Sequence, residues 1–375
     1  MNKKNVIIIM IDGGRTDSAQ KSSIFNQLKT KSIFFSNSIT YGPHTIAAMH
    51  AVFSGCYGTR TGTNSYWSTF KFKKNKFKTL TEYLKDNNYK THADVINQLV
   101  VPKQGFDNYI VHDELNDNLV ERHEKLLDDM HEKKKNNKNF FLYLHYSKIH
   151  TGIMNDVLKV YDNFSDEFFA NKEKNVLRYD KLFQSSEEYL NKILQKINQL
   201  KFNENSIILI MSDHGISIGE KIGERAYGVF CYDYTLKTIT HFLIPNFKSL
   251  EIKQQIRTID FMPTILELLD ISLDSTYSAL DGISLVPIMD KKILPEQYAF
   301  SETGNPLDQK APPKEPNTKS IRNSQWKLIF NEYNDTKELY NIQLDPNENN
   351  NLIGTAEKME EILWIKLKNL INKRD

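Results

Sequence analysis

The chain has 375 residues, of which 39% are hydrophobic and 26% are charged, and its formal net charge at pH 7 is +2. This length permits one large domain, with or without a small appendage, and the nearly balanced charge argues against a nucleic-acid partner. No apolar run approaches the roughly 18 residues that a membrane span needs, and two cysteines, Cys56 and Cys231, cannot build a disulfide framework.

Residues 6–11, Val-Ile-Ile-Ile-Met-Ile, form a short apolar run that predicts a strand buried on both faces. Two lysines precede the run, as in a signal peptide, but it is short and lacks a small-residue cleavage site. We therefore expect the first strand of a core and a cytoplasmic protein. The run ends in Asp12, and ligands in open α/β sheets bind beyond the carboxyl ends of strands.

A surface helix is predicted over 17–30, an extended segment over 32–41 and a helix over 45–53. Pro43 before the last helix and Gly55 after it fit the usual asymmetry of helix ends. Thr45 therefore lies at or near a helix N-terminus. A hydroxyl there is usually a helix cap, but a helix N-terminus also favours phosphate or sulfate.

The middle of the chain predicts a helix over 80–87, strands over 89–95 and 140–146, a long helix over 176–200 and a strand over 206–211. A helix that delivers a parallel strand is the βαβ unit. The last strand ends in Ser212-Asp213-His214-Gly215, where a carboxylate beside an imidazole is a plausible pair of metal ligands. An ordinary turn is the alternative interpretation of this segment.

The C-terminal part predicts a strand over 238–245, a helix over 260–269, strands within 321–329 and 338–340, and a final helix from about residue 356. Residues 303–319 are rich in Pro, Lys and polar groups, which is typical of a linker or flap. We expect a catalytic α/β domain over 1–302, this linker, and a C-terminal subdomain over 320–375 packed on the core.

Several motifs together resemble the sulfatase-like branch of the alkaline phosphatase superfamily. They are residues 5–12, Thr45 placed nine residues before Ser54, residues 212–215, residues 260–264, residues 281–287, and the segments between Trp326 and Leu352. Their order and rough spacing hold along nearly the whole chain. The resemblance implies a doubly wound, mostly parallel sheet flanked by helices, with a small α+β C-terminal subdomain.

The resemblance also implies one divalent metal ion, Mn, Mg, Ca or Zn, held by Asp12, Thr45, Asp213 and His214. Thr45 would be the covalent nucleophile, because a metal lowers the pKa of a hydroxyl and neutralises non-bridging oxygens. His150 matches the position at which the family places a histidine facing the substrate or the leaving group. A loop histidine without a chemical role is the alternative for His150.

Other residues are candidates for contacts with substrate anions, with a structural role as the alternative: Lys237, His241 and Arg15. A second metal would need His150 and His241, with Asp180 as a weak third ligand, so one metal is expected. The aromatic residues Tyr227, Phe230, Tyr232 and Tyr234 are expected in the core or at a subunit contact rather than in a ligand pocket.

The sequence departs from true sulfatases at three points. Those enzymes carry Cys or Ser at the nucleophile position, oxidised to formylglycine and followed by Pro and Arg, whereas Thr45 cannot give the aldehyde and Met49 replaces the Arg. Gly13 stands where the family has a second Asp. The Lys and His that usually follow the strand near residue 95 are missing.

A Thr nucleophile resembles the phosphodiesterase, phosphonate-hydrolase and phosphoethanolamine- or phosphoglycerol-transferase members. We therefore expect a metal-dependent hydrolase or transferase cleaving a phosphodiester or phosphonate monoester on a small molecule or a glycan. One alternative is a sulfuric ester hydrolase that works without formylglycine. Another is a catalytically inactive member that binds a glycan or a partner.

Overall fold

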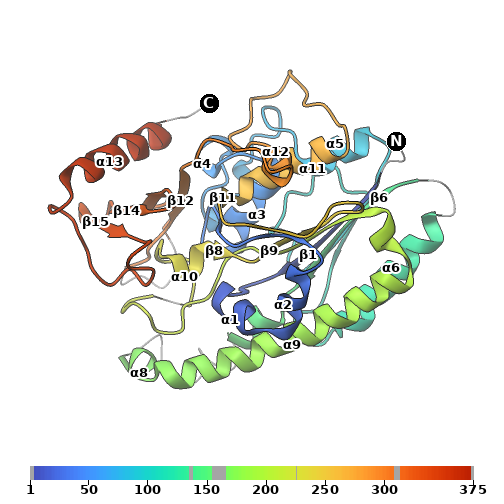
Figure 1. The fold of residues 1–375 in the computed structure, drawn as a ribbon, viewed down its shortest axis with the longest axis horizontal. Helices are drawn as coiled ribbons and strands as arrows, with labels where there is room; N and C mark the ends of the chain where they lie inside the picture. The colour runs from blue at the N-terminus through green and yellow to red at the C-terminus, as the bar shows by residue number, and fades with distance from the viewer. Residues whose placement is uncertain (1–3, 135–137, 154–165, 225, 308–312, 373–375) are drawn as a thin grey trace.

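The computed structural model describes residues 4–134, 138–153, 166–224, 226–307 and 313–372 (Figure 1). An eight-stranded sheet with the order β10-β2-β9-β7-β1-β6-β4-β5 forms its centre. Its strands are β1 (Asn5–Ile11), β2 (Ile33–Phe35), β4 (Lys90–Val95), β5 (Asn108–Val111), β6 (Phe140–Tyr146), β7 (Ser206–Ser212), β9 (Thr240–Leu243) and β10 (Leu250–Ile252). The sheet is mostly parallel, which confirms the predicted α/β fold class.

The three central strands place the ends that carry acidic residues side by side. β1 runs parallel to both β7 and β6, with Ile11 opposite Ser212 and Tyr146. Every residue of these three strands is buried, as expected for strands covered on both faces. Because β1 and β7 end at the same level, Asp12 and Asp213 emerge next to each other at the carboxyl edge.

Helices cover both faces of the sheet (Figure 1). One face packs against α1 (Thr16–Lys21), α2 (Ser23–Lys29), α6 (Leu119–Lys134) and α9 (Lys172–Gln199). The other face packs against α3 (Thr45–Ser54), α5 (Leu80–Asp86), α11 (Phe261–Leu268) and α12 (Val286–Met289). Among the described helices, none combines the length and apolarity that a membrane crossing requires. Both cysteines are buried thiols.

Two predicted elements are each divided in the structure. The expected helix over 17–30 breaks at Ser22, which is extended (φ −73°, ψ 132°) and whose side chain caps α2 by accepting from Phe25 N. The expected strand over 238–245 divides at Ile239 between β8 (Lys237–Thr238) and β9. β8 belongs to a separate three-stranded sheet with β3 (Ser38–Ile39) and β11 (Ile256–Arg257).

Sequence patterns did not predict β5 and α6. β5 is an edge strand with an exposed or half-buried surface, and α6 is rich in charged residues with few buried apolar ones. The remaining short elements are α4 (Gly58–Thr61), η1 (Tyr66–Lys71), α7 (Lys148–Gly152), α8 (Asp166–Ala170), η4 (Phe202–Glu204), α10 (Asp233–Leu236) and η5 (Thr258–Asp260).

The C-terminal subdomain is a four-stranded antiparallel sheet with one helix. It consists of β12 (Ala299–Thr303), β13 (Thr318–Arg322), β14 (Trp326–Asn331), β15 (Thr336–Asn341) and α13 (Glu357–Asn372). The sheet begins at Ala299, so it includes residues that we expected in the catalytic domain. The expected linker over 303–319 starts at the end of β12 and reaches into β13, and its residues 308–312 lie outside the described residues.

Candidate metal and catalytic site

Asp12, Asp213 and His214 meet at the carboxyl edge of the sheet, where β1 and β7 end. Their potential ligand atoms all lie within 4.8 Å of one another, and the three residues are buried. Gly13 has a positive φ of 72°, a conformation that glycine adopts without strain. Its N–H donates to Asp213 Oδ1 at 3.1 Å, and His214 N donates to the same oxygen at 2.9 Å. The turn after β1 therefore fixes one carboxylate oxygen and leaves the other available.

The free atoms of this group are all acceptors. Asp12 Oδ1 and Asp213 Oδ2 are buried and have no hydrogen-bond partner among the described residues. His214 Nδ1 lies 2.7 Å from Gly215 O, which can only accept, so Nδ1 carries a proton, and in the neutral ring Nε2 presents a lone pair. His214 Nε2 lies 3.7 Å from Asp12 Oδ1 and 3.4 Å from Asp213 Oδ2. Such a set of lone pairs fits a divalent cation.

Thr45 adds a hydroxyl to this group from the first residue of α3. Its Oγ1 lies 3.4 Å from both Asp12 Oδ2 and His214 Nε2. The helix cap is His44, whose Nδ1 accepts from Ala47 N. Burial lowers the pKa of His44 to about 3, which keeps the ring neutral and able to accept. Because His44 caps the helix, the Thr45 hydroxyl is not needed as a cap and faces the two carboxylates.

Histidines surround the Asp12 carboxylate. His145 Nε2 contacts Asp12 Oδ2 at 3.0 Å from within β6. Burial alone would raise the pKa of Asp12, but His150, His145 and His214 hold it below its ordinary value. Burial and the adjacent charge of Asp12 raise the pKa of Asp213. Two buried carboxylates with opposite pKa shifts are a pair that a shared cation would stabilise.

A cavity of about 280 Å³ opens in front of Thr45. Its described lining comprises Asp12, Thr45, Ile46, Tyr66, Ile96, Asn97, Leu99, Val100, Glu114, His150 and Tyr227. His150 lies between two carboxylates, with Nδ1 3.9 Å from Asp12 Oδ1 and Nε2 4.0 Å from Glu114 Oε1. The structure thus brings His150 to the same cavity as Thr45. The predicted set Asp12, Thr45, Asp213, His214 and His150 lies together.

Arg15 and Lys237 lie elsewhere. Both line a separate cavity of about 480 Å³ near the C-terminal subdomain. Arg15 pairs with Asp17 and Glu220, each at 2.7 Å, and Lys237 pairs with Asp233 at 3.2 Å. The structure therefore does not bring these two predicted anion contacts to Thr45. Carboxylates on α1, α10 and the loop after β7 already neutralise their charges.

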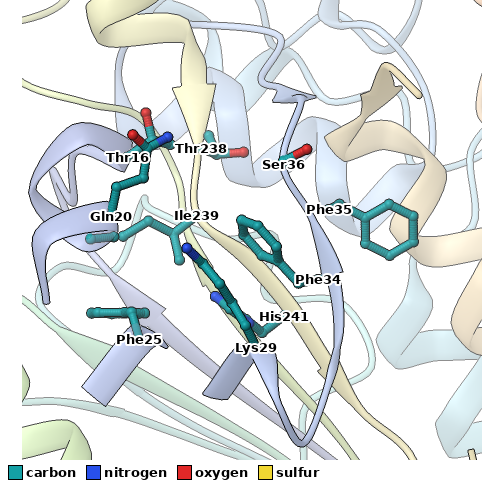
Figure 2. Close-up of a pocket in the computed structure, with 11 residues that line it drawn as sticks. Thr16, Gln20, Phe25, Lys29, Phe34, Phe35, Ser36, Thr238, Ile239 and His241 are labelled. Carbon is teal, nitrogen blue, oxygen red and sulfur yellow. The ribbon is translucent and has the colours of Figure 1, made fainter. Parts of the chain in front are cut away.

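His241 is also separate from Thr45. Figure 2 shows it beside Phe34 and Lys29 in a small pocket of about 20 Å³. Its ring stacks on Phe34 at 4.7 Å, and its Nδ1 contacts Ser32 Oγ at 2.9 Å. Burial and the charge of Lys29 lower the pKa of His241 to about 3. Strand alternation turns His241 towards α2, so its expected role in substrate or second-metal binding finds no geometric support.

Asp180, the weak third ligand expected for a second metal, contacts Ser18 Oγ at 3.3 Å and is not part of the Asp12 group. The aromatic residues after β7 divide between two places. Tyr227 lines the cavity and stacks on His214, with ring centroids 5.1 Å apart. Tyr232 packs with Phe230 and Tyr234 against the C-terminal sheet. The expected core role therefore holds for all but Tyr227.

Sequence patterns did not single out several residues of the site: His44, Tyr66, Glu114, His145 and Tyr227. For His145 a signal was present, since an imidazole inside an apolar strand near its carboxyl end needs a polar partner. The others come from loops and a short helix, where no periodic pattern indicates which side chain faces the cavity.

The geometry places a hydroxyl at the start of a helix beside a buried set of potential metal ligands, at the carboxyl edge of a mostly parallel sheet. A family model described as Sulfatase matches residues 4–271, more than half of the chain. The chain therefore belongs to the sulfatase family, in the sulfatase branch of the alkaline phosphatase superfamily. A second model, described as N-sulphoglucosamine sulphohydrolase, C-terminal, matches residues 228–374.

A relative and two solved structures are also similar to this chain. A sulfatase of Formosa agariphila is 28% identical over 162 residues, which cover 42% of this chain and 28% of that relative. The yidJ protein of Bacteroides fragilis, solved as a candidate sulfatase, has a TM-score of 0.78 at 17% identity and covers 100% of this chain and 96% of its own. BT4656, solved with its substrate D-glucosamine-2-N,6-O-disulfate, has a TM-score of 0.73 at 17% identity. The match covers 98% of this chain and 97% of BT4656. At these identities the two structures show the shared fold.

Proposed function

We propose that this chain hydrolyses a sulfate ester, using the Thr45 hydroxyl as its nucleophile instead of formylglycine. The observation that carries the proposal is the convergence of Thr45 Oγ1 with Asp12 Oδ2 and His214 Nε2. Beside them lie Asp12 Oδ1 and Asp213 Oδ2, which have no partner among the described residues. Membership of the sulfatase family favours sulfate over the phosphoester that the Thr nucleophile first suggested. The substrate of BT4656 supports a sulfated carbohydrate as the organic part.

Charge at the site also supports a substrate with one negative charge. Asp12 and Asp213 together would balance the two positive charges of a divalent ion. The described residues that line the cavity include no Lys or Arg. With Glu114 also in the lining, a site holding such an ion has no excess positive charge, which disfavours a dianionic phosphate monoester. Sulfate esters and phosphodiesters carry a single charge.

The residues that would hold the metal are Asp12, Asp213, His214 through Nε2 and Thr45 through Oγ1. When bound, a divalent ion would stabilise negative charge on the transferred group. Thr45 Oγ1 donates to Asp12 Oδ2, so this carboxylate oxygen is placed to accept the hydroxyl proton as Oγ1 forms a bond to sulfur. The bond from sulfur to the alcohol oxygen breaks, and His150 donates a proton to that oxygen. Water then releases sulfate and restores the Thr45 hydroxyl.

A phosphodiester or phosphonate monoester is the second candidate substrate. The observation that favours it is Thr45 itself, because a threonine cannot become the formylglycine on which sulfate-ester cleavage by this family otherwise depends. Phosphoryl transfer to a hydroxyl needs no aldehyde. The same residues would serve either reaction, and a transferase would use an acceptor hydroxyl in place of water.

Rates on 4-nitrophenyl sulfate, 4-nitrophenyl phosphate and bis(4-nitrophenyl) phosphate, with Mn²⁺, Mg²⁺, Ca²⁺ or Zn²⁺, test the proposal. We expect the sulfate ester to be preferred. Thr45→Ala should lower kcat by at least about 10³-fold, whereas Thr45→Ser, which keeps a hydroxyl, should retain part of the activity.

Thr40→Ala is the matched control, because Thr40 is a buried threonine outside the described lining of the Thr45 cavity, and its hydroxyl has no partner among the described residues. Unchanged turnover in Thr45→Ala would remove Thr45 from the nucleophile role. Preference for bis(4-nitrophenyl) phosphate would replace sulfate by the second candidate. Metal binding without turnover of any ester would support the inactive, binding-only alternative.

A further inference from the structure

A second buried polar cluster lies beside the site and has no place in the proposed reaction. It consists of Asp94 at the end of β4, His112 after β5 and His123 on α6, all three buried. Asp94 Oδ1 contacts His112 Nδ1 at 2.6 Å and His123 Nε2 at 3.4 Å. Their ligand atoms lie close enough together to hold a metal, as do those of Asp12, Asp213 and His214.

The hydrogen bonds distinguish this cluster from a metal site. Each ring nitrogen already has a partner, since His112 Nε2 contacts Ser147 Oγ at 3.0 Å and His123 Nδ1 contacts Tyr189 Oη at 2.6 Å. Arg122 Nε donates to Asp94 Oδ2 at 2.5 Å, so a cation already balances the carboxylate. By contrast, the Asp12 group contains acceptor atoms that lack any partner among the described residues. The Asp94 cluster is therefore a satisfied hydrogen-bond network.

One branch of this network leads to the helix that carries His150. The Asp94 carboxylate can only accept, so His112 Nδ1 donates to it, and in the neutral ring His112 Nε2 accepts from the Ser147 hydroxyl. Ser147 immediately precedes α7, and its carbonyl accepts from Thr151 N at 3.0 Å. His150 lies one residue before Thr151 on this single turn of helix. The position of Ser147 thus helps to set the position of α7, together with the contacts of Lys148 and Thr151 with Glu114.

We propose that Asp94 and His112 are positioning residues, which hold Ser147 and the first turn of α7 so that His150 faces the leaving group. This inference rests on the proposed function, in which His150 protonates the leaving oxygen. α7 has only five residues, and a helix this short is not stable without tertiary contacts. A buried side-chain anchor at its start therefore has a large effect on where its side chains lie.

Two amide substitutions of His112 test the chain of contacts from Asp94 to Ser147. His112→Asn keeps a donor near the Nδ1 position but cannot reach Ser147, whereas His112→Gln can reach Ser147. We expect His112→Asn and Ser147→Ala to speed amide hydrogen exchange over residues 148–152 by about tenfold, and the double variant to add nothing further. His112→Gln should restore much of the protection.

A kinetic measurement distinguishes positioning from a merely structural role. If α7 shifts, kcat/KM should fall more for an alkyl ester, whose leaving oxygen needs a proton, than for the 4-nitrophenyl ester, whose leaving oxygen does not. The matched control is His123→Gln, which contacts the same carboxylate but connects to Tyr189 on α9 and not to α7. It should leave both the exchange of α7 and the ratio between the two esters unchanged.

Unchanged exchange over α7 in His112→Asn would overturn the proposal. Equal losses of kcat/KM on both esters would also overturn it. A third contrary result would be a zinc ion at the Asp94 cluster, bound by the parent and by Asp213→Asn but not by His123→Gln. If the parent hydrolyses no ester, the exchange measurement still decides whether Asp94 and His112 hold α7. Failure of the proposed function and failure of the positioning role are therefore separable.

Discussion

Asp213 shows how single side chains decide the chemistry of this site. One of its oxygens accepts two backbone N–H groups, while the other is buried without a partner among the described residues. Leaving a buried carboxylate oxygen unpaired is costly, and this is the reason for proposing that a cation binds there. His214, with its proton fixed on Nδ1 by Gly215 O, offers a lone pair to the same place.

Metal binding should therefore stabilise the fold. At a hundredfold excess of ion over Kd, binding to the native state alone adds about 2.7 kcal/mol, which should appear as a rise in Tm with Mn²⁺ or Zn²⁺ and a fall with EDTA. Asp213→Asn should abolish this response. Asp180→Asn, which contacts only Ser18 among the hydrogen bonds described, should keep it. A Tm indifferent to EDTA in the parent would contradict the assignment.

Glu302 gives a prediction for pH. Burial raises its pKa from 4.5 to about 7, in spite of Lys319 and the hydrogen bond from Tyr41. The folded state therefore binds more protons than the unfolded chain between these values, so stability is full below about pH 4.5 and is lost as the pH rises through 7. The contribution is of the order of 3 kcal/mol.

Glu302→Gln should remove this part of the pH dependence, because the amide keeps an acceptor for Tyr41 and does not ionise. The measurement is the free energy of unfolding by urea at pH 5 and pH 8 in parent and variant. Glu332→Gln, on the half-exposed partner of Lys319, is the control and should keep most of the slope. Identical slopes in parent and Glu302→Gln would show that the carboxyl titrates normally.

At the scale of elements, the site depends on the ends of β1, β7 and α3. Parallel pairing aligns the two strands so that their last residues lie opposite each other, and α3 starts with Thr45 directly after the His44 cap. The loop after β7 passes close to α10, and a side chain on Gly215 would lie 2.1 Å from Tyr234 O. Close backbone packing thus fixes the turn that presents His214.

Gly215→Ala should test this turn. The added methyl group must displace backbone, so we expect a loss of about 1–3 kcal/mol or more together with weaker metal binding, because His214 moves. Gly354→Ala is the comparison: it has a positive φ of 75° but no atom within 4 Å of the added Cβ, so it should cost only about 1 kcal/mol. Urea unfolding and metal titration measure both effects, and equal losses would argue against close packing at Gly215.

At the scale of the whole molecule, a buried ionic network joins the C-terminal sheet to the catalytic core. Asp233 on α10 contacts Arg322 on β13 at 2.5 Å and Lys327 on β14 at 2.9 Å. Lys327 also contacts Glu348 at 2.7 Å. Burial alone would raise the pKa of Asp233, but Arg322 and Lys327 hold it well below its ordinary value. Breaking such a network leaves uncompensated buried charge.

Lys327→Met should therefore destabilise the protein by about 3–5 kcal/mol. Lys71→Met is the matched control, because Lys71 and its partner Glu315 are both more than half exposed and such pairs contribute under about 1 kcal/mol. Urea unfolding followed by tryptophan fluorescence suits the test, since Trp326 and Trp364 lie in the C-terminal subdomain. Similar losses in the two variants would rule out a stabilising role for the network.

The amino-acid sequence by itself predicted the central strands, the helix at Thr45 and the convergence of Asp12, Thr45, Asp213 and His214. Apolar runs of strand length and residues at strand and helix ends are local signals, and parallel pairing brings strand ends together without further information. The same local signals did not place Lys237 and His241, because these residues lie in β8 and β9, and the sequence does not state how those strands pair or which way they face.

Only the tertiary structure decided which other side chains reach the site. His145, Glu114 and Tyr227 come from three separate parts of the chain. His112 contacts Asp94 and Ser147, which also lie far from it in the sequence. Such contacts depend on how the helices and loops pack over the sheet, and a difference of one residue along a strand reverses the face on which a side chain lies. Periodicity therefore predicts the elements, but packing selects the residues that complete the chemistry.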